Sequence, residues 1–179
     1  SEPDLRSAAE AAAYLRTLRA VLRSIEVSDA DMEKGQFRCD ANVSLRLHGA
    51  KQLGTRNEIK NLNSFRFVAK AIEWERDRHV RTLESGGQVV QETRLWNDAR
   101  GETVPMRSKE AAMDYRYFPE PDLHPVEIAR DWIERARASQ PELPRARRDR
   151  FVASLGLPRQ DAEVLTQEKG TADFFEAEV

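Results

Sequence analysis

Acidic residues on two neighbouring predicted strands have the chemistry of a metal or phosphate site. Segment 37–46 alternates apolar and polar residues, so one face of a strand would carry Arg38, Asp40, Asn42, Ser44 and Arg46. Segment 55–62 is predicted to be the returning strand, with one face made of Arg56, Glu58 and Lys60. Magnesium prefers oxygen ligands and is often held by one or two carboxylates together with substrate phosphates. Asp40 and Glu58, flanked by basic side chains, therefore suit a metal-bound nucleotide.

The same pattern has a simpler interpretation. Oppositely charged side chains on adjacent strands can form a ladder of ion pairs on a solvated face, and such pairs add little stability. Spacing alone favours this ladder, because no histidine or further acid is fixed beside Asp40 and Glu58. The metal site therefore needs support from beyond the spacing.

A cluster of amides stands where the second strand meets a helical pattern. The residues Lys60-Asn61-Leu62-Asn63-Ser64 precede that pattern. A helix N-terminus attracts anions through its free backbone N–H groups and its dipole. Asn61 and Asn63 are therefore candidates for phosphate contacts. Asn63 and Ser64 are also N-cap residue types, and capping alone would explain one of them.

Basic and aromatic residues interleave further along the chain, in Met106-Arg107-Ser108-Lys109-Glu110 and Tyr115-Arg116-Tyr117-Phe118-Pro119. This mixture suits a single-stranded nucleic-acid end, where bases stack on rings and phosphates meet basic groups. The alternative is that the aromatic residues pack a junction between domains. The pattern leaves both interpretations open.

An antiparallel sheet with packed helices, which is an α+β fold, would position these residues. The sequence predicts strands over 37–46, 55–62, 88–96 and 103–107. The first two are joined closely enough to be antiparallel neighbours, and Pro105 places the fourth at an edge or bulge. A helix follows the capping pattern that starts at Ser7. Between the second and third strands, a long helix is predicted, and one stripe along it consists of Phe65, Val68, Ile72, Arg76, His79 and Leu83.

The chain changes character near Leu123, where prolines become frequent. Short helical patterns follow at 126–138, 145–155 and 161–166, and another begins near 171. We therefore predict one domain over 1–122 and a helical segment over 123–179. The chain opens without methionine and closes in an unfinished amphipathic pattern, so we interpret it as an internal piece of a longer protein.

Composition narrows the function classes. The net charge is −2, from 29 basic and 31 acidic residues, so nucleic-acid binding would need a local patch. The single cysteine, Cys39, excludes an internal disulfide and fits a reducing, cytoplasmic location. No apolar run approaches the roughly 20 residues of a membrane span. The sequence also lacks the glycine-rich nucleotide loops, CxxC, HExxH and the G-x-S-x-G nucleophile elbow.

Several long motifs occur together along the chain. They include Arg38-Cys39-Asp40-Ala41-Asn42-Val43-Ser44, Glu58-Ile59-Lys60-Asn61-Leu62-Asn63-Ser64-Phe65, Gln91-Glu92-Thr93-Arg94 and Asp114-Tyr115-Arg116-Tyr117-Phe118-Pro119. In these motifs and their order, the chain resembles the B subunit of the bacterial aspartyl/glutamyl-tRNA amidotransferase. The resemblance implies that 1–122 is the C-terminal part of a catalytic cradle domain. It also implies that 123–179 is a linker and the truncated start of a helical domain.

The resemblance implies an ATP-dependent carbon–nitrogen ligase that uses glutamine as its amido-nitrogen donor. The family phosphorylates the side-chain carboxylate of Glu-tRNA(Gln) or Asp-tRNA(Asn) and replaces the phosphate with ammonia. Its cofactors are ATP and Mg²⁺. Its partners are the mischarged tRNA, a glutaminase (A) subunit that supplies ammonia, and a small C subunit, in a cytoplasmic heterotrimer without membrane attachment.

The resemblance also assigns roles to residues. Glu58 and then Asp40 are the expected metal ligands, and both are expected with Lys60 in catalysis. ATP and substrate contacts are expected at Arg38, Asn42, Asn61 and Asn63. Contacts with the tRNA are expected at Arg107, Lys109, Tyr115 and Arg116. Further metal ligands would precede Ser1, so we expect this chain alone to be inactive.

Two alternatives remain. In one, this segment is a tRNA-binding and subunit-assembly module without catalytic residues of its own. In the other, the polar sheet face is buried against partner subunits.

Overall fold

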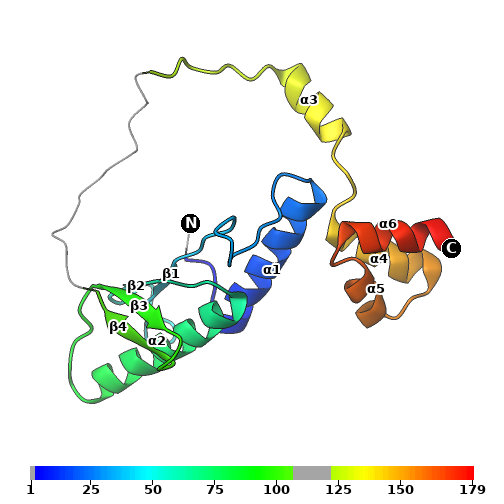
Figure 1. Cartoon of the computed structure of the whole chain (residues 1–179). Helices are drawn as coiled ribbons and strands as arrows, with labels where there is room; N and C mark the ends of the chain where they lie inside the picture. Colours follow the sequence, from blue (N-terminus) through cyan, green and yellow to red (C-terminus); the bar gives the residue numbers. More distant parts are fainter. Residues whose placement is uncertain (1–2, 107–121) are drawn as a thin grey trace. The chain divides into compact units, whose positions relative to one another are not determined.

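The computed structural model describes residues 3–106 and 122–179 and divides the chain into two compact units (Figure 1). The first unit comprises Ser1–Arg19 with Asp29–Ser108, and the second comprises Ala20–Ser28 with Lys109–Val179. The first unit contains a four-stranded sheet and the second contains a group of helices. The α+β class predicted from the sequence is confirmed.

The sheet consists of β1 (Ala41–Val43), β2 (Asn57–Lys60), β3 (Thr93–Asn97) and β4 (Glu102–Pro105), in that order. The β1–β2 and β3–β4 pairs are antiparallel, and β4 is an edge strand, as Pro105 predicted. The β2–β3 pair is parallel, so the sheet is mixed and not wholly antiparallel. The cause is the helix α2 (Phe65–Glu84), which returns the chain to the starting end of β2 before β3 begins.

The strands are shorter than the alternation predicted. Segment 37–46 pairs with β2 only through its three central residues, although the alternation continues on both sides. The predicted third strand starts five residues late, at Thr93. The reason lies in the carbonyl groups of Val90 and Glu92, which accept hydrogen bonds from the side chain of Asn57. At Val90 a side chain thus takes the place of a backbone partner, whereas the Glu92 carbonyl also accepts from the backbone N–H of Glu58.

Helix α2 begins and ends where its residue types predict. The Ser64 hydroxyl caps it by accepting from the N–H of Phe67 at 3.1 Å. Its buried stripe, however, differs from the predicted one: Val68, Ala71, Glu75 and His79. Arg76, which the helical spacing placed on the stripe, is exposed, and the neighbouring Glu75 is buried instead. The sequence interpretation took the wrong charged residue, because Glu75 finds buried partners that spacing does not reveal.

The core of the first unit lies between the sheet, α2 and the helix α1 (Ala8–Ser24). Ser7 accepts from the Glu10 N–H at 3.1 Å, which confirms the predicted cap. The buried core residues are Ala11, Leu15, Ala41, Val43, Ile59, Leu62, Val68, Ala71 and Trp96. The sheet residues among them face inward, so the residues between them in the strands face outward.

The second unit contains α3 (Arg130–Ala138), α4 (Pro144–Leu155), α5 (Arg159–Leu165) and α6 (Lys169–Glu178). The four helical patterns predicted from the sequence are confirmed, although α3 starts four residues later than expected. A small core of Phe151, Ala162 and Ala172 joins α4, α5 and α6. Within the described ranges, no helix has the length and apolar character needed to cross a membrane.

Candidate functional site on the open face of the sheet

Three strands contribute polar side chains to one row on the outward face. Asn42 on β1 lies opposite Glu58 on β2, and Glu58 lies opposite Thr93 on β3. The Thr93 hydroxyl donates to Glu58 Oε2 at 3.0 Å. Lys60 Nζ lies 3.6 Å from the same oxygen. The fold thus brings together Asn42, Glu58 and Lys60, which the sequence had placed in one site, and adds Thr93.

Solvent access keeps these groups available to a ligand. The side chains of Glu58 and Lys60 are 35% and 42% exposed, so water screens their ion pair and it contributes little to stability. Both contacts of Glu58 involve Oε2, and Oε1 has no protein partner among the described residues. A carboxylate oxygen beside an amide is a donor set that fits Mg²⁺ when phosphates and water complete the coordination.

The two other predicted residues near β1 lie outside the paired part of that strand. Arg38 and Asp40 are exposed and precede the first residue of β1. The residue opposite Glu58 is Asn42, and Asp40 lies two positions before it. Across residues 3–106 and 122–179, no group of three or more His, Cys, Asp or Glu side chains is placed to hold a metal ion. The role of Asp40 as a ligand stays a prediction.

The predicted phosphate-binding amides make contacts within the protein. Asn61 has a left-handed backbone, with φ of 65°, and its Nδ2 donates to the carbonyl of Trp96 at 3.0 Å. Asn63 Nδ2 donates in turn to Asn61 Oδ1 at 3.4 Å. The first of these bonds ties the residue after β2 to β3, and the second joins the two amides to each other. Asn63 remains exposed beside the first turn of α2. The four predicted tRNA-contact residues, Arg107, Lys109, Tyr115 and Arg116, lie outside the described residues.

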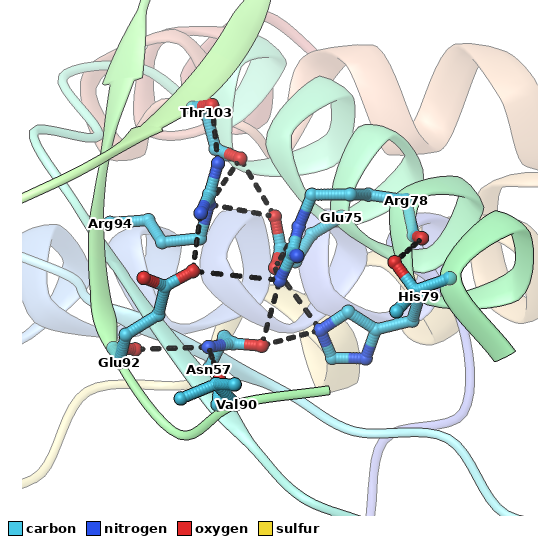
Figure 2. A network of polar contacts seen from close by, with 9 residues as sticks. Asn57, Glu75, Arg78, His79, Val90, Glu92, Arg94 and Thr103 are labelled. Atoms are coloured by element: carbon cyan, nitrogen blue, oxygen red, sulfur yellow. Dashed lines mark hydrogen bonds and ion pairs between the residues drawn. The ribbon is translucent and has the colours of Figure 1, made fainter. Parts of the chain in front are cut away.

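The inward face carries a polar network that the sequence interpretation missed (Figure 2). Its centre is Glu75, which accepts from Arg78 Nε at 2.9 Å and from the Thr103 hydroxyl at 2.7 Å. His79 Nε2 lies 3.1 Å from Glu75 Oε1, and Arg94 Nε lies 3.5 Å from Oε2. Burial would raise the pKa of Glu75, but hydrogen bonds from His79, Arg78 and Thr103, with the charge of Arg78, lower it to about 2.

The network also joins the strands to one another. Arg94 Nε donates to the Thr103 hydroxyl at 2.9 Å, its Nη2 donates to the Thr103 carbonyl at 2.8 Å, and its Nη1 pairs with Glu92. Asn57 accepts from Arg78 Nη2 at 2.9 Å. The only sequence signal was the Glu75–His79 spacing of four residues, which places both on one side of a helix. Nothing in the spacing indicated their partners on the strands.

The first unit is thus an α+β domain whose mixed sheet has one helix-covered face and one open polar face. A family model described as the GatB/GatE catalytic domain matches residues 1–134, and the chain belongs to this family. The motif resemblance is therefore confirmed.

Curated relatives extend the match to the whole chain. It is 52% identical over 179 residues to the B subunit of the aspartyl/glutamyl-tRNA(Asn/Gln) amidotransferase of Thermodesulfovibrio yellowstonii, covering 100% of this chain and 38% of the relative. The protein of the same name from Anaeromyxobacter sp. is 58% identical over 177 residues, covering 99% and 37%. That of Persephonella marina is 57% identical over 179 residues, covering 100% and 38%. The chain thus spans under two fifths of the length of these relatives.

Proposed function

We propose that this chain is part of the subunit of a tRNA-dependent amidotransferase that activates and amidates a carboxylate carried on tRNA. A side-chain carboxylate oxygen of Glu-tRNA(Gln) or Asp-tRNA(Asn) attacks the γ-phosphorus of ATP, and ADP leaves. Ammonia then attacks the acyl carbon, and phosphate leaves with the formation of the amide. A glutaminase (A) subunit would supply the ammonia, and a small C subunit would complete the complex. Membership of the GatB/GatE catalytic-domain family carries this proposal.

The open face supports it chemically. Attack of a carboxylate on a phosphate brings several negative charges together, and bound Mg²⁺ supplies charge neutralisation there. Glu58, with Asp40 as the second predicted ligand, would hold the ion through its oxygens. Lys60 Nζ, 3.6 Å from Glu58, would turn to a phosphate oxygen of ATP. Asn42, opposite Glu58, would orient the acyl group or the nucleotide by hydrogen bonding.

The remaining predicted contacts surround this row. Arg38 is exposed at the approach to β1, which suits a phosphate contact. Asn63 stands beside the first turn of α2, where N–H groups favour an anion. Asn61 keeps its neighbour Asn63 in place through their side-chain hydrogen bond. Arg38 and Asn63 would contact the nucleotide, with Asn61 supporting Asn63, whereas Glu58 and Lys60 would act at the reacting phosphate.

The test is the Glu58→Gln substitution in the full-length subunit, assembled in its complex. We expect ATP-dependent phosphorylation of the charged tRNA to fall roughly 100-fold or more, because the carboxylate that would hold the charge-neutralising Mg²⁺ is lost. Glutamine hydrolysis by the partner subunit should continue. Glu73→Gln is the matched control, because Glu73 is an exposed glutamate of α2 away from the row.

Normal transamidation by the Glu58→Gln complex would overturn the proposal. It would favour the tRNA-binding and assembly module, for which substitutions at Arg107 and Arg116 should weaken tRNA binding, whereas substitutions at Asp40 and Glu58 should leave phosphorylation intact.

A further inference from the structure

Asn57, the first residue of β2, is held on the inward face by four hydrogen bonds (Figure 2). Its Nδ2 donates to the carbonyl of Val90 at 2.8 Å and to that of Glu92 at 3.2 Å. Its Oδ1 accepts from Arg78 Nη2 at 2.9 Å and lies 2.6 Å from His79 Nε2. Carbonyl oxygens only accept, so the amide has one orientation and His79 Nε2 carries the hydrogen.

The carbonyl of Glu92 connects this side chain to the open face. It accepts from Asn57 Nδ2 at 3.2 Å and also from the backbone N–H of Glu58 at 3.1 Å. The next residue, Thr93, is the one that lies opposite Glu58 and donates to its carboxylate. The buried amide of Asn57 therefore holds β3 beside β2 at the position where Glu58 and Thr93 meet.

This connection matters because the β2–β3 pair is parallel. The register of a parallel pair is not set by a tight turn, and here the whole of α2 separates the two strands. A slip of one residue would turn Thr93 inward and Arg94 outward, since successive strand residues face opposite sides. The register must therefore be fixed by contacts such as those of Asn57.

We propose, resting on the function proposed above, that Asn57 is a positioning residue for the phosphoryl-transfer site. Its amide fixes the register of β2 against β3 and so holds the Thr93 hydroxyl against the carboxylate of Glu58. Arg78 and His79 hold the amide from α2, and the charges of Glu75, Glu92, Arg78 and Arg94 balance around it. Asn57 thus sets the geometry of the outward row without touching a ligand.

The test is Asn57→Ala in the full-length subunit, assembled in its complex. We expect kcat for amidation to fall roughly 10- to 100-fold, with KM for ATP and tRNA within about threefold, because misplacement by about 1 Å is costly to the chemical step. The loss should be much smaller in a Thr93→Val background, since both changes act through one contact. Thr103→Val is the control: it also removes network hydrogen bonds, but on β4, and should leave kcat within about threefold.

The outcomes separate the two proposals. An active Glu58→Gln complex overturns the proposed function. If the Glu58→Gln complex is inactive but Asn57→Ala has a normal kcat, only the positioning role is overturned. The positioning role is also overturned if Asn57→Ala lowers kcat by the same factor with Thr93 and with Thr93→Val. If Asn57→Ala does not fold, Arg78→Met decides, because Arg78 is partly exposed and supplies one of the hydrogen bonds to Asn57. Its kcat should fall about threefold to tenfold, and an unchanged kcat contradicts the proposal.

Discussion

The two faces of the sheet carry similar residue types, but the inward face buries them in a hydrogen-bonded network and the outward face leaves them partly exposed. On β2 and β3, Asn57 and Arg94 point inward, and their neighbours Glu58 and Thr93 point outward. Inward, the Glu75 carboxylate is fully buried and has hydrogen bonds from several groups. Outward, Glu58 is 35% exposed and both of its contacts involve one oxygen.

The difference shows what burial demands of charged groups. A buried carboxylate persists only when several donors satisfy it, because desolvation otherwise costs several kcal/mol. Such a network cannot rearrange easily, so it fixes the strands that carry it. An exposed carboxylate has a small desolvation cost and can exchange partners. The rigid face is thus suited to set geometry, and the open face is suited to bind a ligand.

The largest expected effect tests the rigid face. Glu75→Gln removes the central charge and turns an amide group toward the donors of Arg78, Arg94 and Thr103. We expect the 179-residue chain to lose about 3–5 kcal/mol of unfolding free energy, as when one partner of a buried pair is removed. Urea unfolding monitored by circular dichroism measures this loss.

Two controls accompany that measurement. Glu73→Gln makes the same substitution at an exposed position of the same helix and should change stability by less than about 0.5 kcal/mol. Glu58→Gln makes it on the open face and should cost no more than about 1 kcal/mol. Equal losses at Glu75 and Glu58 would contradict the distinction between the faces.

The open face could be predicted from the sequence because strand alternation is a local property. Alternate residues of a strand share a face whatever the strand pairs with, so Asn42, Glu58 and Lys60 were placed correctly on polar faces. Thr93 was missed as part of the row, since the third strand was predicted only as a span. Its position opposite Glu58 depends on a parallel pairing that alternation does not specify.

The inward network could not be predicted, because its partners come from distant segments. The Glu75 side chain meets Thr103 across 28 positions, and Asn57 meets Glu92 across 35. Helical spacing alone favoured a stripe through Ile72, and Arg76 lies on the same side of the helix because it is four residues further on. Only the strand groups that face α2 make Glu75 the better residue to bury.

The pH dependence of stability is the second prediction. The pKa of Glu75 is lowered from 4.5 to about 2 by the hydrogen bonds and charges of Arg78, His79 and Thr103. Below pH 4.5 the unfolded chain binds a proton that the folded chain does not bind until about pH 2. The stability contributed by Glu75 is therefore complete above about pH 4.5 and is lost as the pH falls toward 2, by about 3 kcal/mol in total.

Comparison with Glu75→Gln isolates this contribution from the other acidic groups. The difference in unfolding free energy between the unsubstituted chain and the variant should shrink as the pH falls from 4.5 to about 2. It should be constant between about pH 5 and pH 7. A difference that is independent of pH over the acid range would mean that Glu75 is not an ionised centre of the network.

The smallest effects come from a matched pair of threonines. Thr103 on the inward face donates to Glu75 at 2.7 Å and accepts from Arg94 at 2.9 Å, whereas Thr93 on the outward face donates to Glu58 at 3.0 Å. Valine has nearly the same shape as threonine without the hydroxyl. Thr103→Val should therefore cost about 1–3 kcal/mol, because it leaves buried charged partners unsatisfied.

Thr93→Val should cost less than about 1 kcal/mol, because water can replace the hydroxyl beside the partly exposed Glu58. Thermal unfolding of the two variants compares the stability lost on each face, because the same Thr→Val substitution is made on the adjacent strands β3 and β4. Activity should show the reverse order: amidation by the full-length complex should fall with Thr93→Val and stay within about threefold with Thr103→Val. If both measurements rank the two variants in the same order, stability and ligand chemistry are not divided between the two faces of the sheet.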